Sequence, residues 1–144
     1  MTTQEDQIVL KALAFLAKTS GQLDTFRTRL KQTRQLHAAS FVECRNYGDK
    51  VYLCICLEAA PRESQTLTWW MDITLREKGW LIEASALWNG RHAVAQIPPL
   101  HVPSFQAVQD EVPAILDQLL QAGAAVLDKI ITQKIPPDQP PGGG

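Results

Sequence analysis

Three cysteines are the first candidates for metal chemistry in this sequence, and two of them, Cys54 and Cys56, stand close together in an apolar run. The third, Cys44, precedes a turn expected at residues 48–49, where a glycine takes the first central position of a type II′ hairpin. That turn makes Cys44 face Leu53, whereas Cys54 and Cys56 point to the opposite side of the sheet. Because three thiolates then cannot converge on one ion, we expect no metal and no cofactor.

A second candidate chemistry is acid–base catalysis by Asp72, Glu83 and His92, which the expected strand registers place on one face of a sheet. A catalytic base must lie within about 3 Å of the reacting atom and be held there by an orienting group. No spacing of His, Cys, Asp, Glu, Ser or Gly in the chain matches a catalytic or cofactor signature. We therefore favour a non-enzymatic protein, and keep a small-molecule or enzymatic pocket at these three residues as the alternative.

The elements that must position these residues are strands, recognised by alternating apolar and polar side chains. In residues 67–76 the large apolar side chains take odd numbers, with Trp70 as the exception. After a two-residue turn at residues 78–79 they take even numbers, as such a turn requires. Asn89 and Gly90 indicate a type I′ turn, which sets Ala86 opposite Ala93 and Ile82 opposite Ile97. The predicted strands span residues 39–46, 51–59, 66–76, 80–88 and 91–97.

Helices are expected on both sides of these strands. A broad apolar stripe at helical spacing predicts one helix to about Lys18 and a second from there to about Leu36; the stripe begins with Val9, Ala12, Leu13 and Leu16. Residues 98–103 contain three prolines, so they are expected to leave the sheet edge as an extended connection. Ser104 then caps a C-terminal helix that reaches about Gln133 and kinks or restarts near Pro113.

This order of elements predicts an α+β two-layer sandwich. A five-stranded antiparallel meander sheet carries the N-terminal helices and the C-terminal helix on one face. The helices are expected over a patch of small side chains that lets a helix approach closely, formed by Ala84, Ala86, Ala93 and Ala95.

Composition bounds the class of protein. The 144 residues are 45% hydrophobic and 20% charged, which predicts one domain over residues 1–133, followed by a disordered tail at 134–144 that is rich in Pro and Gly. The net charge of −1 gives no attraction to nucleic acid or to an anionic membrane. The N-terminus is acidic where a signal peptide would be basic, so we expect a cytoplasmic protein.

The sheet face that points away from the helices mixes aromatic, apolar and charged side chains, whereas a merely solvated face would be mostly polar. We expect this face to bind a protein partner or a second copy of the chain, with Trp70 as anchor. The chain would then be a protein-binding module, such as an adaptor, a chaperone-like protein or an inhibitor or immunity-like protein. The expected binding residues are Phe41, Glu43, Tyr52, Trp70, Asp72, Glu83, Leu87, His92 and Val94.

Overall fold

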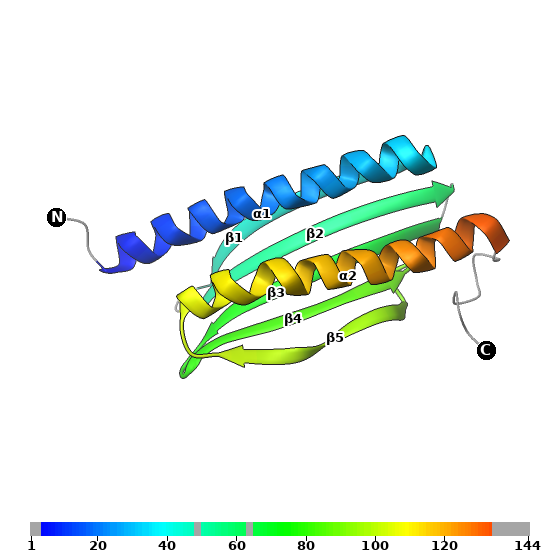
Figure 1. Ribbon diagram of the computed structural model, residues 1–144. Coiled ribbons are helices and arrows are strands. Elements are labelled where there is room, and N and C mark those ends of the chain that lie inside the picture. The colour runs from blue at the N-terminus through cyan, green and yellow to red at the C-terminus, as the bar shows by residue number, and fades with distance from the viewer. Residues whose placement is uncertain (1–3, 48–49, 63–64, 134–144) are drawn as a thin grey trace.

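The computed structural model describes residues 4–47, 50–62 and 65–133, and these form two helices and five strands. Along the chain they are α1 (Gln4–Arg34), β1 (His37–Tyr47), β2 (Lys50–Arg62), β3 (Gln65–Arg76), β4 (Gly79–Trp88), β5 (His92–Val102) and α2 (Phe105–Gln133). The strands make one antiparallel sheet in the order β1-β2-β3-β4-β5, and both helices lie on the same side of it (Figure 1). The predicted α+β two-layer sandwich with a meander sheet is confirmed.

The core fills the space between the helices and the sheet. Leu53, Ile73 and Ala86 on the helix side of the sheet have no exposed surface. Two edge-on aromatic contacts join the layers and the helices: the rings of Phe26 and Trp69 lie 5.9 Å apart, and Phe15 of α1 lies 5.7 Å from Phe105 of α2. Ala84 and Ala86 are buried under the helical layer, as expected for the small side chains.

The two helices predicted to end near Lys18 and Leu36 form one continuous helix, α1. A side chain at Gly21, close to the predicted boundary at Lys18, would meet open space, so no contact there demands a break. Helix α2 is likewise continuous through Pro113, where a kink or a restart was expected. Because proline has no N–H, the carbonyl of Gln109 loses its intrahelical donor at this point.

The predicted N-cap of α2 is present. The Ser104 hydroxyl oxygen accepts a hydrogen bond from the backbone N–H of Ala107 at 3.1 Å, which satisfies one of the free donors of the first helical turn. The tail predicted at residues 134–144 lies outside the described residues.

The first two hairpin registers keep the predicted faces. Strands β1 and β2 pair Val42 with Ile55 and Cys44 with Leu53, as expected, although the turn at residues 48–49 that should set this register lies outside the described residues. Strand β2 continues to Arg62, beyond its predicted end at residue 59, and β3 begins at Gln65, one residue before its predicted start.

The turn between β3 and β4 lies one residue earlier than expected. Arg76 pairs with Gly79, which begins β4 with φ of 125°. The odd residues of β3 still share a face with the even residues of β4, so Trp69 lies opposite Ala86. The predicted faces are therefore kept despite the different turn.

The predicted register of β5 is wrong. Asn89 and Gly90 have the positive φ values of a type I′ turn, 52° and 70°, and the N–H of Arg91 donates to the carbonyl of Trp88 at 3.1 Å. The ladder nevertheless starts with Trp88 opposite His92 and then shifts twice at irregularities. As a result the expected pairs Ala86–Ala93 and Ile82–Ile97 are replaced by Ala86–Ala95, Ala84–Ile97 and Ile82–Leu100.

Residues 98–103 do not leave the sheet as expected, because β5 continues to Val102. Its position at the sheet edge explains why Pro98 and Pro99 are tolerated, since an edge strand pairs on one side only. Val102 lies opposite Trp80 and is 7% exposed, so the extension covers part of the core. Ala93, expected under the helix, pairs with Leu87 and is exposed.

Candidate functional site

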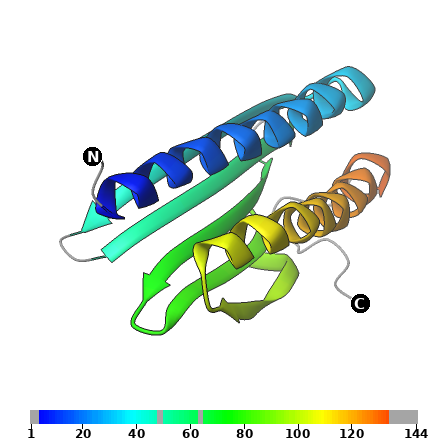
Figure 2. The same cartoon turned by 60° about the vertical axis from the view of Figure 1, so that its left-hand side comes forward.

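The sheet face opposite the two helices is called the outer face here; Figure 2 shows both helices on the other side of the sheet. Its side chains form rows that cross the strands, because directly paired residues share a face. One row, the aromatic row, consists of Phe41, Cys56, Trp70 and Ser85. The next, the acidic row, consists of Glu43, Cys54, Asp72 and Glu83.

The aromatic row offers apolar surface to solvent. Phe41 on β1 is 51% exposed, and Trp70 on the central strand β3 is partly exposed between Cys56 and Ser85. Trp69, its neighbour along the strand, points to the helices and is 1% exposed. One tryptophan therefore belongs to the core and the other to the outer face.

Asp72 is the centre of the polar contacts on this face. It accepts hydrogen bonds from the Tyr52 hydroxyl and the Cys54 thiol. Burial, followed by the Asp72 hydrogen bond and charge, raises the pKa of Tyr52 far above its ordinary value. Burial and the Asp72 charge raise the pKa of Cys54 to about 12, and burial with the Glu58 charge raises the pKa of Cys56 to about 11. Both thiols are therefore protonated at neutral pH and poor nucleophiles.

Two carboxylates of the acidic row face each other without an intervening strand. Asp72 on β3 lies directly opposite Glu83 on β4, an arrangement in which like charges destabilise a sheet. Glu43 differs, because Arg45 on the same strand forms an ion pair with it. The Asp72–Glu83 pair is thus the part of the face best suited to receive a cation from another molecule.

The structure brings together seven of the nine expected binding residues. The outer face holds Phe41, Glu43, Tyr52, Trp70, Asp72, Glu83 and Leu87.

His92 and Val94 do not join this face. His92 lies opposite Trp88, which is fully buried on the helix side, and Val94 packs against the core. Their expected placement depended on a two-residue turn and a regular ladder. Instead, three residues separate Trp88 from His92, and Val94 lies at the irregularity between Ala86 and Leu87. The alternative pocket of Asp72, Glu83 and His92 is not assembled, because the histidine is on the other side of the sheet.

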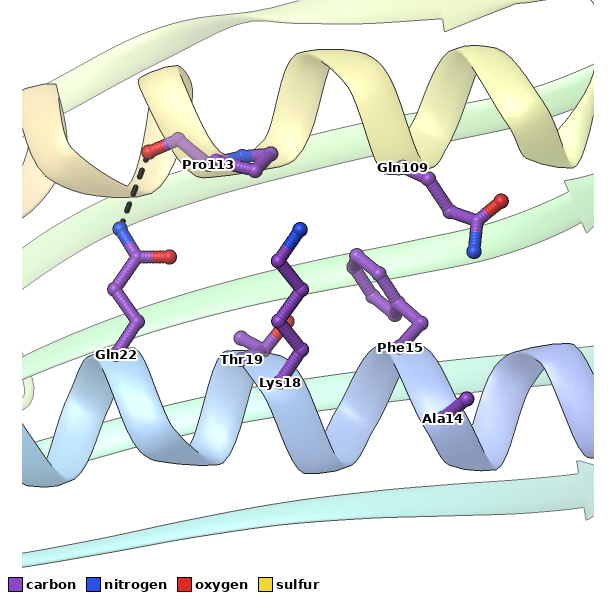
Figure 3. Close-up of a pocket in the computed structure, with 7 residues that line it drawn as sticks. All are labelled: Ala14, Phe15, Lys18, Thr19, Gln22, Gln109 and Pro113. Atoms are coloured by element: carbon purple, nitrogen blue, oxygen red, sulfur yellow. Dashed lines mark hydrogen bonds between the residues drawn. The ribbon is translucent and has the colours of Figure 1, made fainter.

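A cleft between the helices was not expected from the sequence (Figure 3). Helices α1 and α2 run parallel to each other, and the Nε2 group of Gln22 donates to the carbonyl oxygen of Pro113 at 3.2 Å across the gap. A cavity of about 320 Å³ beside this contact is lined by Ala14, Phe15, Lys18, Thr19, Gln22, Gln109 and Pro113. The available sequence signal for this cleft was Pro113 inside an apolar helical stripe. Such a proline does not reveal which helix lies opposite.

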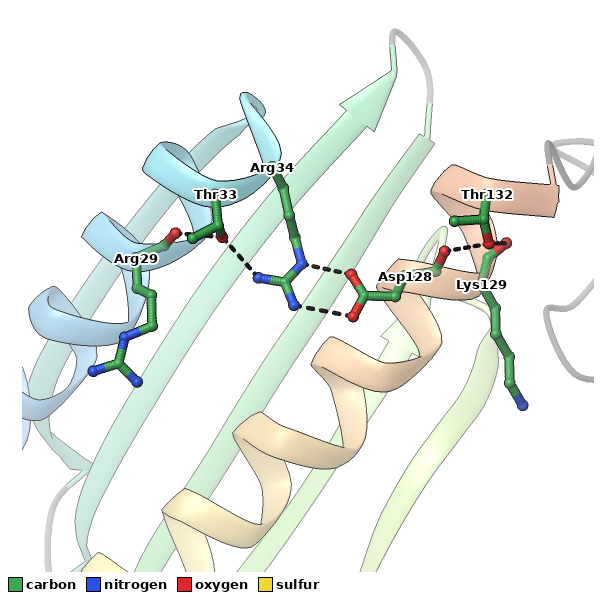
Figure 4. Close-up of polar contacts among 6 residues, drawn as sticks. All are labelled: Arg29, Thr33, Arg34, Asp128, Lys129 and Thr132. Carbon is green, nitrogen blue, oxygen red and sulfur yellow. Dashed lines mark hydrogen bonds and ion pairs between the residues drawn. The ribbon is translucent and has the colours of Figure 1, made fainter.

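The far ends of the two helices are joined by a bidentate ion pair (Figure 4). The Arg34 guanidinium donates to the two carboxylate oxygens of Asp128 at 2.6 and 3.0 Å. Side-chain hydroxyls of Thr33 and Thr132 bond back to their own helices nearby. These contacts are structural, since they tie the helical layer together.

Among the described residues, no group of three His, Cys, Asp or Glu side chains is arranged to hold a metal ion. In the same part of the chain, no helix is long and apolar enough to cross a membrane. No protein-family model, no curated protein and no solved structure matches this chain. The outer face is therefore the feature of the chain that indicates a function.

Proposed function

We propose that the protein is a non-enzymatic, cytoplasmic binding module whose outer face docks a basic segment of a partner protein. One observation supports this: a five-stranded face left uncovered by both helices carries an aromatic row beside an acidic row. Aromatic anchors ringed by polar groups are how protein interfaces concentrate binding energy.

The aromatic row and the acidic row would contact different side chains of the partner. Trp70 and Phe41 supply apolar contact area, whose burial stabilises a complex without dictating orientation. Asp72 and Glu83 accept charge-assisted hydrogen bonds from a Lys or Arg of the partner, which also relieves their mutual repulsion. A partner segment with an apolar side chain next to a basic one fits both rows. The carboxylates disfavour nucleic acid, whose phosphates carry the same sign of charge.

A second copy of the chain is the weaker occupant for this face. A two-fold contact between two outer faces would bring the acidic rows of both copies together, and like charges in a desolvated interface cost affinity. The partner on the outer face is therefore a protein different from the chain itself.

The test is Trp70→Ala. Removing a central aromatic anchor should weaken partner binding about thirtyfold or more, because such an anchor is worth about 2 kcal/mol or more. Partners are captured from a lysate with the wild-type protein, identified by mass spectrometry, and titrated against both proteins by calorimetry. Gln121→Ala, at an exposed position on α2, is the control and should bind as the wild type does.

Trp69→Ala shows whether lost binding is merely lost folding. Trp69 is core, so its truncation should cost about 3–5 kcal/mol of unfolding free energy, and Trp70→Ala should cost clearly less. A partner bound equally by wild type and Trp70→Ala, or a loss of stability in Trp70→Ala as large as in Trp69→Ala, would contradict the proposal.

A further inference from the structure

Strand β1 forms one edge of the sheet, and within the described residues only β2 pairs with it. Its 11 residues pair with β2 in one unbroken register from His37 opposite Ala60 to Tyr47 opposite Lys50. The strand contains no proline and no irregularity interrupts it. A long, regular edge presents a row of free N–H and C=O groups that can pair with another strand.

The exposed apolar side chains are concentrated beside this edge. Among the described residues, the exposed large hydrophobic side chains are Val9, Leu10, Leu13 and Phe41, with exposures of 55%, 57%, 54% and 51%. The first three belong to α1, the helix above β1, and Phe41 belongs to β1 itself. Phe41 lies on the outer face, so the exposed apolar surface on the helix side of this edge is that of α1, and another chain could bury it.

The position of Leu13 along β1 follows from one contact. The Ser40 hydroxyl donates to Asp24 at 3.5 Å, which places this part of α1 beside Ser40, the fourth residue of β1. Helix and strand run in opposite directions, and they rise by about 1.5 and 3.3 Å per residue respectively. The 11 positions from Asp24 back to Leu13 thus correspond to about five strand residues, which brings Leu13 over the region of Cys44 and Arg45.

Symmetry restricts how β1 can pair with its own copy. Odd and even residues of β1 lie on opposite faces of the sheet, and directly paired residues share a face. If the helices of both copies are to lie on one side, odd residues must therefore pair with odd residues and even residues with even. The axis then passes midway between one residue and the same residue of the other copy. An axis at Glu43 would set two carboxylates against each other, whereas an axis at Cys44 sets Glu43 of each copy opposite Arg45 of the other.

We propose that the chain forms a two-fold dimer in which β1 pairs antiparallel with β1 of a second copy, centred on Cys44. Two observations favour this register. The exposed Leu13 of α1 lies near Cys44, and the register sets Glu43 of each copy opposite Arg45 of the other. Helix α1 packs beside its copy through Val9 and Leu13, and the two sheets become one. This contact leaves the outer face open and does not depend on the function proposed for it.

Sedimentation of the reduced protein tests the dimer. The wild-type chain should show a mass twice the 16.0 kDa of one chain. Leu13→Glu should raise the dimer dissociation constant at least about tenfold while leaving the thermal melt of the monomer intact, because Leu13 is already exposed. Ala122→Glu, an exposed alanine on α2, is the matched control and should remain dimeric. A wild-type protein that stays monomeric at high concentration, or a dimer that Leu13→Glu does not weaken, overturns the proposal.

Cross-linking tests the register. Paired residues in antiparallel strands have Cα atoms about 4.5–5.5 Å apart, within the range of about 4.4–6.8 Å that a disulfide spans. Copper–phenanthroline should therefore oxidise Cys44 of both copies to one disulfide, accepting two electrons as two protons are released. Cys44→Ser should abolish the cross-linked dimer, and the double variant Cys54→Ser with Cys56→Ser should keep it. Cross-linking that survives Cys44→Ser, or none in a protein that sediments as a dimer, overturns the Cys44-centred pairing.

Discussion

The two edges of the sheet are built in opposite ways. Strand β5 carries Pro98 and Pro99 and shifts its register twice against β4, and both features prevent a further strand from pairing with it. Strand β1 has neither feature, and its register with β2 is regular throughout. A protein that protects one edge and leaves the other regular has an edge available for assembly.

The helices above the two edges also differ, in how far their apolar side chains are buried. Helix α2 packs so closely that Gly123 lies directly on the indole of Trp69, and its large apolar side chains point inward, as Leu119 and Leu127 do with no exposed surface. Helix α1 leaves Val9 and Leu13 more than half exposed. Among the described residues, the exposed large apolar side chains of the two helices therefore all belong to α1.

The largest expected contrast is in thiol reactivity. Cys44 lies at the open edge and is exposed, whereas Cys54 and Cys56 lie among the carboxylates of the outer face. With a pKa of about 12 in place of the ordinary 9.0, the thiolate fraction of Cys54 falls about a thousandfold at neutral pH. For Cys56, with a pKa of about 11, the fall is about a hundredfold. The measurement uses the Leu13→Glu variant, because weakening the proposed dimer leaves Cys44 exposed. Iodoacetamide labelling followed by mass spectrometry should modify Cys44 first. Labelling of Cys54 at the rate of Cys44 would contradict this expectation.

The same raised pKa values make stability depend on pH in the alkaline range. The folded chain holds the protons of Cys54 and Cys56 more tightly than the unfolded chain, so their contribution is complete below the ordinary pKa of 9.0 and is lost as pH rises towards 11–12. Urea unfolding across that range should show this loss in the wild type. It should be smaller in the double variant Cys54→Ser with Cys56→Ser.

A pair of glycine substitutions compares the packing of the two helices. A methyl group at Gly123 would lie 1.9 Å from Nε1 of Trp69, so Gly123→Ala should cost about 1–3 kcal/mol of unfolding free energy. At Gly21 nothing lies within 4 Å, and Gly21→Ala should instead stabilise α1 by about 0.5–1 kcal/mol. Urea unfolding of both variants provides the measurement. Equal stability of the two would mean that α2 does not pack as closely as described.

The smallest effect is expected at the protected edge. Replacing Pro98 and Pro99 by threonine restores two backbone N–H donors, and should cost about 0.4–1 kcal/mol per proline through the freer unfolded chain. It should also permit weak association at β5, detected as species larger than the dimer in sedimentation at high concentration. If no such species forms, the two register shifts alone are enough to protect this edge.

Side-chain alternation predicted the sheet faces well where pairing is regular. The parity of β3 assigned Trp69 to the core and Trp70 to the outer face, and the exposures agree. The pairing of Cys44 with Leu53 was also predicted correctly, because β1 and β2 keep one register along their length. Period-two patterning reflects a physical requirement, the burial of one face, so it survives small errors in the turn positions.

The errors occur where the determining interaction is not local. The turn before β5 has three residues where Asn89 and Gly90 predicted two, and Asn89 is held by hydrogen bonds to Thr66 of β3; this turn moved His92 to the helix side of the sheet. Val9 and Leu13 belong to the apolar stripe expected to be core, yet they are exposed in the single chain. An apolar stripe shows that a surface must be buried, but not whether the same chain or another one buries it.

The meander order determines which contacts join residues that are far apart in the sequence. Each strand pairs with its neighbour in sequence, so sheet formation requires only short closures. Contacts between residues more than 90 positions apart join α1 to α2, as in the hydrogen bonds from Gln22 to Pro113 and from Arg34 to Asp128. We therefore expect the helix pair to close after the folding transition state. Asp128→Asn should then accelerate unfolding in stopped-flow experiments and leave the refolding rate nearly unchanged, whereas slower refolding would place this closure earlier.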